Sequence, residues 1–171
     1  SGIRPTRASG NIQVSNFTAK MFWASCHGTD NAAMVDALRR GSGRYAGVAM
    51  IDESFTNADI AALHAAGVRG ARFSFRQALG AVLSRPAFDR AVARIRELGW
   101  YMKVQPEQTG IMESVSWFED LDIPILIDHM GRPDAALGPN RDPNIAKLRQ
   151  LLARGNFWVM LSLGEKISQA G

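Results

Sequence analysis

The stretch Ile125-Leu126-Ile127-Asp128-His129-Met130-Gly131-Arg132-Pro133-Asp134 joins a short apolar run directly to a cluster of polar side chains. The apolar part lies between Pro124 and Gly131, and this is typical of a buried strand. Asp128, His129 and Arg132 follow it at once. In an α/β barrel, the carboxyl ends of the strands are where functional side chains gather. The stretch therefore predicts a strand of a parallel sheet that ends at a candidate active site.

Apolar segments with the length of strands alternate along the whole chain with segments that have helical spacing. Strands are predicted at residues 21–26, 45–51, 68–73, 100–104, 123–128 and 157–162. Helices are predicted at residues 31–40, 57–66, 86–98, 111–121 and 144–154. Glycines that can end a helix follow four of these segments, at Gly41, Gly67, Gly99 and Gly155. Pro86 and Pro143 favour helix starts, because the first turn of a helix needs no N–H from them.

This strict alternation predicts an α/β fold with a parallel sheet whose helices are right-handed crossovers. Two architectures satisfy the pattern, namely a segment of a β/α barrel and an open doubly wound sheet. Polar residues at several strand ends favour the barrel. A doubly wound sheet with a phosphate site is the weaker alternative, because no glycine-rich phosphate-binding motif follows a predicted strand.

Length and composition limit the classes of protein that fit. The chain has 171 residues, whereas a closed barrel of eight β/α units typically needs about 250. It is 46% hydrophobic and 21% charged, as in ordinary globular proteins, and lacks an apolar run long enough to span a membrane. We expect residues 1–20 to be a loose arm and residues 21–171 to form the barrel segment.

Charge and cysteine content add expectations about partners and location. The net charge of +4 comes from arginines spread over the chain, so neither nucleic acid nor a membrane is an expected partner. An arginine-lined pocket for a small anionic substrate accounts for the excess equally well. The single cysteine, Cys26, cannot form an intramolecular disulfide, and the start of the chain lacks a secretory pattern. These features predict a cytoplasmic protein.

Three motifs resemble one family. They are the stretch 125–134, the segment Ser25-Cys26-His27-Gly28-Thr29-Asp30-Asn31, and the segment Gly67-Val68-Arg69-Gly70-Ala71-Arg72-Phe73-Ser74-Phe75. In this order they are similar to the amidohydrolase-related superfamily, in the branch of 2-pyrone-4,6-dicarboxylate hydrolases and sugar lactonases. The resemblance implies an incomplete (β/α)8 TIM barrel of about six βα units, corresponding to strands two to seven of that fold.

The resemblance also implies roles for five side chains. The residue matching His129 is catalytic in the family, and Arg72 and Arg132 match arginines that hold the substrate. Ser25 and His27 match the same pocket. A guanidinium can pair with a carboxylate through two parallel hydrogen bonds, which suits an anionic lactone.

Each of these residues has a structural alternative. His129 could bond to a neighbouring carboxylate or carbonyl, and His27 to the backbone of its loop. Arg72 and Arg132 could be partners in salt bridges within the barrel. Strand alternation turns Asp128 away from His129, so a packing or helix-contact role for Asp128 fits at least as well as a catalytic one.

The chain departs from the family in its catalytic groups. Metal-using members carry a His-x-His pair on strand one and an aspartate on strand eight, and neither has a counterpart here. We therefore expect no cofactor, and a divalent metal only where a partner chain supplies ligands. The catalytic base would also come from that partner.

Two functions remain open from the sequence. The first is hydrolysis of a carboxylated lactone or related cyclic ester. The second is a non-catalytic dicarboxylate-binding or assembly module with the same fold. Both involve two unpaired sheet edges, which predict a homo-oligomer or a complementing chain.

Overall fold

The six predicted strands are present in the computed structural model, which describes the backbone of residues 19–22 and residues 28–76 and 82–166 in full. All of them are parallel, and each pairs with its neighbour in sequence, in the order β1-β2-β3-β4-β5-β6. Their bounds are β1 Ala19–Phe22, β2 Tyr45–Met50, β3 Val68–Ser74, β4 Tyr101–Gln105, β5 Ile125–Ile127 and β6 Phe157–Val159. β5 and β6 are shorter than predicted. β1 includes residues 19–20 of the predicted arm, and its predicted continuation lies outside the described residues.

Four of the five predicted helices are confirmed within two residues at each end. They are α1 Ala32–Arg40, α2 Asn57–Ala65, α3 Arg85–Glu97 and α4 Pro143–Leu152. The helix starts predicted from prolines are also confirmed, since Pro86 and Pro143 lie in the first turns of α3 and α4. The Asp142 side chain caps α4 by accepting a hydrogen bond from the backbone N–H of Asn144 at 2.7 Å.

The helix predicted at residues 111–121 is wrong. Two short 3-10 turns, Ile111–Glu113 and Val115–Trp117, take its place. Serine and β-branched residues in this segment are weak helix formers. A distant contact adds to the effect, because Asn144 accepts a hydrogen bond from the backbone N–H of Met112 at 3.2 Å.

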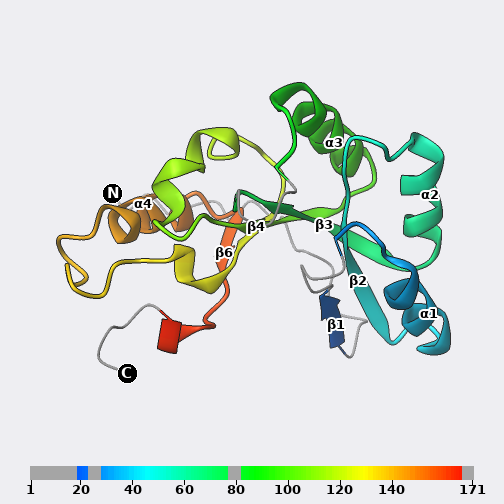
Figure 1. Ribbon diagram of the computed structural model, residues 1–171, viewed down its shortest axis with the longest axis horizontal. Coiled ribbons are helices and arrows are strands. Elements are labelled where there is room, and N and C mark those ends of the chain that lie inside the picture. Colours follow the sequence, from blue (N-terminus) through cyan, green and yellow to red (C-terminus); the bar gives the residue numbers. More distant parts are fainter. Residues whose placement is uncertain (1–18, 23–27, 77–81, 167–171) are drawn as a thin grey trace, which may run out of the picture.

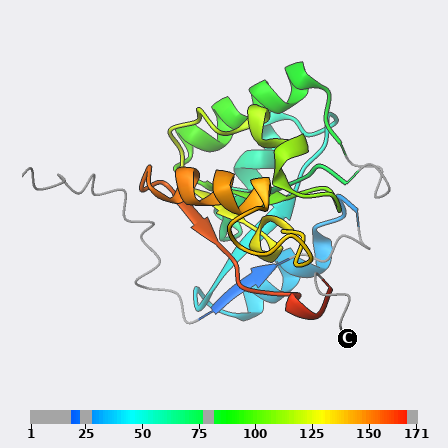
Figure 2. The ribbon, with the colours of Figure 1, turned by 90° about the vertical axis from the view of Figure 1, so that its left-hand side faces the viewer.

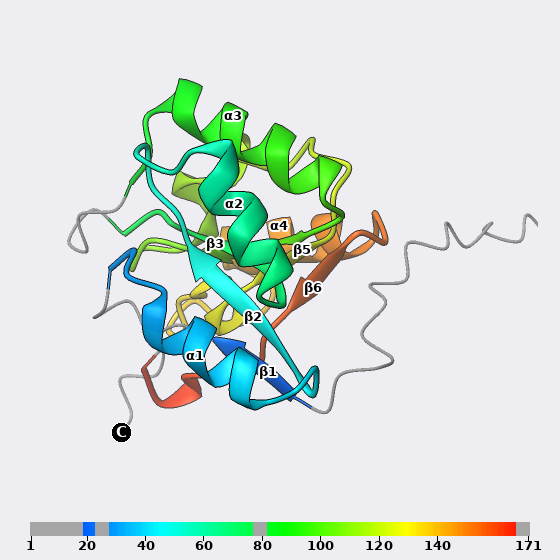
Figure 3. The ribbon, with the colours of Figure 1, turned by 90° about the vertical axis from the view of Figure 1, so that its right-hand side faces the viewer.

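The strand order distinguishes the two architectures that the sequence left open. A doubly wound sheet reverses its strand order at a switch point, whereas here every strand lies beside the next one in sequence. Figure 1 shows the six strands as an open, curved arc with the helices outside it. α1 packs on β2, α2 on β3, α3 on β4 and α4 on β6 (Figures 2 and 3). The chain is therefore a partial β/α barrel.

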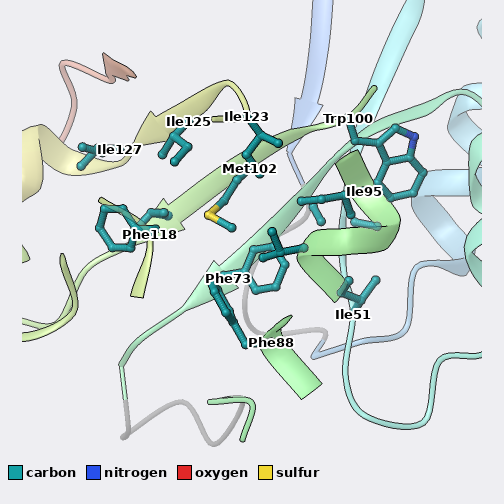
Figure 4. Packing of buried hydrophobic residues seen from close by; sticks show 14 of the residues in the cluster. Ile51, Phe73, Phe88, Ile95, Trp100, Met102, Phe118, Ile123, Ile125 and Ile127 are labelled. Carbon is teal, nitrogen blue, oxygen red and sulfur yellow. The ribbon is translucent and has the colours of Figure 1, made fainter. Parts of the chain in front are cut away.

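The hydrophobic core lies between the arc and its helices. Phe73, Met102 and Ile125 point from three neighbouring strands toward the helix layer, where they meet Phe88 and Ile95 of α3 (Figure 4). Each of these side chains is at most 4% exposed. Burial of one such side chain contributes about 1.5–3 kcal/mol. Because side chains alternate along a strand, the residues between them face the concave side of the arc.

One histidine belongs to this outer layer. His64 of α2 accepts a hydrogen bond at Nδ1 from Nε1 of the buried Trp100 at 2.8 Å. The two rings are stacked, with centroids 6.2 Å apart. Burial lowers the pKa of His64 below its ordinary value, and the charge of nearby Arg69 lowers it further. His64 thus has a structural role in packing α2 against the start of β4.

This contact makes the stability depend on pH. The folded pKa of His64 lies below its unfolded value of about 6.5, so its contribution is complete above that pH and is lost as the pH falls through the folded value. A protonated imidazole cannot accept the Trp100 hydrogen bond, and a buried N–H left unpaired costs about 1–3 kcal/mol. Urea unfolding at about pH 7.5 and about pH 5.5 measures the loss. His64→Gln should show a smaller pH dependence, and equal losses in both proteins would contradict this prediction.

No helix in the described ranges combines the length and the apolar character that crossing a bilayer requires. β1 and β6 lie at the two ends of the arc in Figure 1.

Candidate functional site at the carboxyl ends of β3, β4 and β5

Three charged side chains from adjacent strands meet on the concave side of the arc. Arg72 of β3 lies beside Lys103 of β4 in the strand register. Asp128 follows β5, and its backbone N–H extends the ladder by donating to the Val104 carbonyl at 2.9 Å. The strand neighbours of these residues face the helices. Alternation therefore places Arg72, Lys103 and Asp128 together on the opposite face.

Asp128 is the centre of this cluster. Its carboxylate lies 2.8 Å from Lys103 Nζ and 3.2 Å from Arg72 Nη2. The carboxylate is almost wholly buried, as is the Lys103 side chain. Of the roles left open for Asp128, contact with a helix is therefore wrong. Alternation does turn Asp128 away from the helices, and the error arose because His129 was assumed to continue the strand.

Burial affects the charged and polar groups around Asp128. It lowers the pKa of the Arg72 guanidinium, and the Asp128 carboxylate opposes this effect. It raises the pKa of the Tyr101 hydroxyl, with a further contribution from Asp128. The Tyr101 ring lies against Gly70, where an added Cβ would come within 2.8 Å of it. The end of the site next to Gly70 and Tyr101 is thus tightly filled.

His129 lies just above this cluster. Its Nδ1 is 3.0 Å from the Ser162 Oγ, beyond the end of β6. Burial lowers the pKa of His129, and the charges of Arg132, Arg72 and Lys103 lower it further, while Asp128 raises it. The net shift is downward, so the imidazole is neutral near pH 7. A neutral imidazole donates from one nitrogen and accepts at the other.

The backbone around His129 is in an unusual conformation. His129, Met130 and Arg132 have φ values of 53°, 54° and 53°, in the left-handed region. Such residues cost roughly 1–3 kcal/mol each and cluster at functional sites. Gly131 between them has a φ of 69°, and a Cβ there would lie 3.0 Å from Leu148 of α4. Packing against α4 holds the turn that sets the direction of His129 and Arg132.

A second group of charged residues follows the ends of the same strands. Burial lowers the pKa of Arg132, as does the charge of Arg76, while Glu107 raises it. Arg76 follows β3, and its backbone N–H donates to Ser74 Oγ at 3.3 Å. The Nε atoms of Arg76 and Arg132 are buried without a hydrogen-bond partner in the described part of the chain. Arg76 was not among the residues selected from the sequence, although it lies four residues after Arg72.

The predicted site residues have different outcomes. Arg72, His129 and Arg132 lie on one side of the sheet, at the carboxyl ends of β3 and β5. Ser25 and His27 lie outside the described residues, so their predicted roles stay predictions. Sequence reasoning also missed Ser162, because its contact with His129 joins residues that are distant in the chain.

A hollow of about 360 Å³ lies next to Glu107, beyond the carboxyl end of β4. Phe75, Glu107 and Trp117 are among the residues that line it. A separate hollow of about 560 Å³ lies between α1 and α2, where Val35, Phe55 and Leu63 contribute to its wall. The latter is in the outer layer, away from the charged side chains. The chemistry of the residues therefore favours the strand ends as the functional site.

Comparison with known proteins identifies the family. The family described as Amidohydrolase matches residues 3–170. The chain belongs to this family. Among curated relatives of the chain, a 2-pyrone-4,6-dicarboxylate hydrolase of Comamonas testosteroni is 35% identical over 148 residues, covering 86% of this chain and 48% of the relative. A 4-sulfomuconolactone hydrolase of Rhizobium radiobacter is 31% identical over 146 residues, with coverage of 85% and 48%.

The chain also shares its fold with solved structures. A Pseudomonas putida protein described as a candidate 2-pyrone-4,6-dicarboxylic acid hydrolase is 30% identical, with a TM-score of 0.73. The match covers 88% of this chain and 55% of that one. An Agrobacterium tumefaciens protein solved without ligand has a TM-score of 0.73 at 22% identity, with coverage of 89% and 55%. The chain thus spans about half the length of these relatives.

The described residues of this chain do not fit a divalent metal ion. Nowhere in residues 28–76 and 82–166 do three histidine, cysteine, aspartate or glutamate side chains come together as ligands. Asp128 is in contact with two cations, which is the opposite of the environment that a metal ligand needs.

Proposed function

We propose that this chain carries the substrate-binding half of a hydrolase that opens a carboxylated lactone or related cyclic ester. The observation that carries the proposal is the placement of Arg72, His129 and Arg132 on one side of the sheet at its carboxyl edge. The names of the relatives, which are hydrolases of a pyrone dicarboxylate and a sulfomuconolactone, support the same substrate class.

The proposed chemistry follows from the side chains. Arg72 and Arg132 bind the anionic groups of the lactone as charge-assisted donors. With the Ser162 hydroxyl donating to Nδ1, His129 carries its proton on Nε2 and donates it as a hydrogen bond to the ester carbonyl oxygen. Water adds to the carbonyl carbon, the ring C–O bond breaks, and the products are a carboxylate, a hydroxyl group and a proton.

The general base that activates the water is proposed to come from polypeptide outside this chain. The edges of β1 and β6 are the proposed contact, through a second copy or a complementing chain. Light scattering of the purified chain at micromolar concentration measures its oligomeric state. A stable monomer with slow amide exchange along both edge strands would contradict the proposed contact. The single cysteine also supports a reducing, cytoplasmic location, which cell fractionation tests.

Hydrolysis is tested with 2-pyrone-4,6-dicarboxylate as the substrate, by following proton release in a pH-stat. We propose that turnover persists in excess chelator and that this chain alone holds no metal cofactor. Loss of turnover on addition of chelator would contradict the proposal that hydrolysis is independent of metal. Absence of turnover in both conditions would overturn the claim that the chain is an enzyme, and binding without turnover would favour the non-catalytic dicarboxylate-binding module.

A further inference from the structure

The start of α4 contacts two of the segments that follow the strands at the site. One is the segment after β4, which contains the 3-10 turn Ile111–Glu113, and the other is the turn that carries His129. Leu148 of α4 lies against Gly131 of the His129 turn. Because β4 and β5 are paired neighbours in a parallel sheet, the segments that follow them leave the sheet side by side. α4 is thus placed to hold both segments.

Asn144, in the first turn of α4, makes the contact with the segment after β4. It is buried, and its Oδ1 accepts a hydrogen bond from the backbone N–H of Met112 at 3.2 Å. Its Nδ2 donates to the backbone carbonyl of Thr109 at 3.5 Å. The amide also lies against Gly110, where an added Cβ would come within 2.3 Å of Oδ1. One side chain therefore contacts three positions of this segment.

The turn that Asn144 holds begins at Glu107. The backbone N–H of Gly110 donates to the Glu107 carbonyl at 3.2 Å and closes the turn. Gly110 has a φ of 113°, a conformation that would strain any residue with a side chain. Glu107 forms part of the wall of the hollow beyond β4. The position of this wall therefore depends on a contact with α4 as well as on the sheet.

Asp142 fixes the start of α4 relative to the segment after β5. It is 1% exposed, and its carboxylate accepts hydrogen bonds from the backbone N–H groups of Asn144 and Asp134. Hydrogen bonds to an ionised acceptor are stronger than those between neutral groups. The start of α4 thus joins the turn 107–110 and the segment 129–134 into one unit.

We propose that Asn144 is a positioning residue of the lactone site, which holds the wall at Glu107 at a fixed distance from the His129 turn. This inference rests on the proposed function, since it places the substrate beside that turn. Without the amide, the segment keeps its anchor at the buried Ile111 but gains freedom at residues 107–110. A ligand then has to order this turn when it binds, which weakens binding and leaves the chemistry at His129 unchanged.

Amide exchange and ligand binding test the proposal. In Asn144→Ala, the Met112 amide should exchange at least about tenfold faster, because its acceptor is gone, while the amides of β3 and β4 keep their rates. The affinity for benzene-1,3-dicarboxylate, a planar dianion, should fall by about fivefold to tenfold in isothermal titration. KM for 2-pyrone-4,6-dicarboxylate should rise by the same factor, with kcat within about twofold. Asn144→Asp keeps an acceptor for Met112 and should retain most of the affinity.

Asn156→Ala is the matched control. Nδ2 of Asn156 also donates two hydrogen bonds to backbone carbonyls, those of Leu121 and Ile123, each at 3.0 Å. These contacts lie before β5 and β6, at the opposite end of the sheet from the site. The control should therefore lower stability in urea unfolding and leave affinity and KM unchanged.

The outcomes separate this inference from the proposed function. Equal losses of affinity in Asn144→Ala and Asn156→Ala would overturn the inference, as would an unchanged exchange rate at Met112 or faster exchange with unchanged affinity. Lactone turnover with an unchanged KM in Asn144→Ala would contradict this inference alone. The expected difference in affinity between the two variants, without lactone turnover by the unmodified chain, would contradict the proposed function alone. Absence of probe binding to the unmodified chain would overturn both.

Discussion

Replacing Asp128 with alanine is expected to lower the free energy of unfolding by about 3–5 kcal/mol, because it leaves two buried cations without their shared carboxylate. Lys103 Nζ is 2.8 Å from that carboxylate and Arg72 Nη2 is 3.2 Å from it. The Lys103 side chain is 3% exposed and the Arg72 side chain 10%, so hydration can compensate for little of the loss at Lys103 and only part of it at Arg72. Urea unfolding of the unmodified chain and the variant measures the difference.

A double-mutant cycle separates this charge effect from a loss of packing. Removing the lysine charge with Lys103→Met should offset part of the cost of Asp128→Ala, giving a coupling energy well above about 0.5 kcal/mol. The matched control is Asp89→Ala, which breaks an exposed Asp89–Arg85 pair on α3 with a separation of 2.9 Å. Exposed pairs contribute about 0.2–1 kcal/mol. Comparable losses for Asp128→Ala and Asp89→Ala would show that the buried cluster is not held by its charges.

Replacing His129 with glutamine is expected to lower kcat/KM for the dianionic lactone by about 10²–10³, in line with the loss of one hydrogen-bond donor to a developing oxyanion. Glutamine keeps a polar side chain but not the geometry fixed by Ser162, whose Oγ lies 3.0 Å from the imidazole. The dissociation constant of benzene-1,3-dicarboxylate should change little, because the arginines supply the binding. Steady-state kinetics and titration of the same preparations measure both quantities.

Two further variants make this prediction specific. Ser162→Ala should give a smaller loss in kcat, since it frees the ring without removing it. His64→Gln changes a histidine of the outer layer and should leave kcat unaffected. A His129→Gln variant with unchanged kcat would contradict the catalytic role of His129, whereas a loss of binding equal to the loss of kcat/KM would point to a purely structural one.

Much of the fold could be predicted because it depends on local pattern. The alternation of apolar strands with helices gave the number and order of the elements, and glycines and prolines gave most of the helix ends. The segment at residues 111–121 could not be assigned correctly, because a hydrogen bond from a distant residue, Asn144, helps to shape its turns. Choosing between a barrel and a doubly wound sheet required the strand order itself.

The site was predictable in its residue types and less so in its geometry. Arg72, His129 and Arg132 could be selected from the sequence as candidates, but the alternation rule holds only as far as Asp128 and fails at His129. The left-handed φ values at His129 and Arg132 are not visible in a pattern of polar and apolar residues. The contacts of Asp128 with Arg72 and Lys103 were missed for the same reason, since they depend on where the strand stops.

The sequential strand order also bears on how the site assembles. Each strand docks onto one made shortly before it, so most stabilising contacts join segments that are close in the chain, a topology associated with rapid folding. The cluster of Arg72, Lys103 and Asp128 is contained within residues 68–128. During synthesis, its ion pairs can therefore form once this stretch has emerged from the ribosome, whereas the turn that directs His129 forms later, when α4 packs against Gly131.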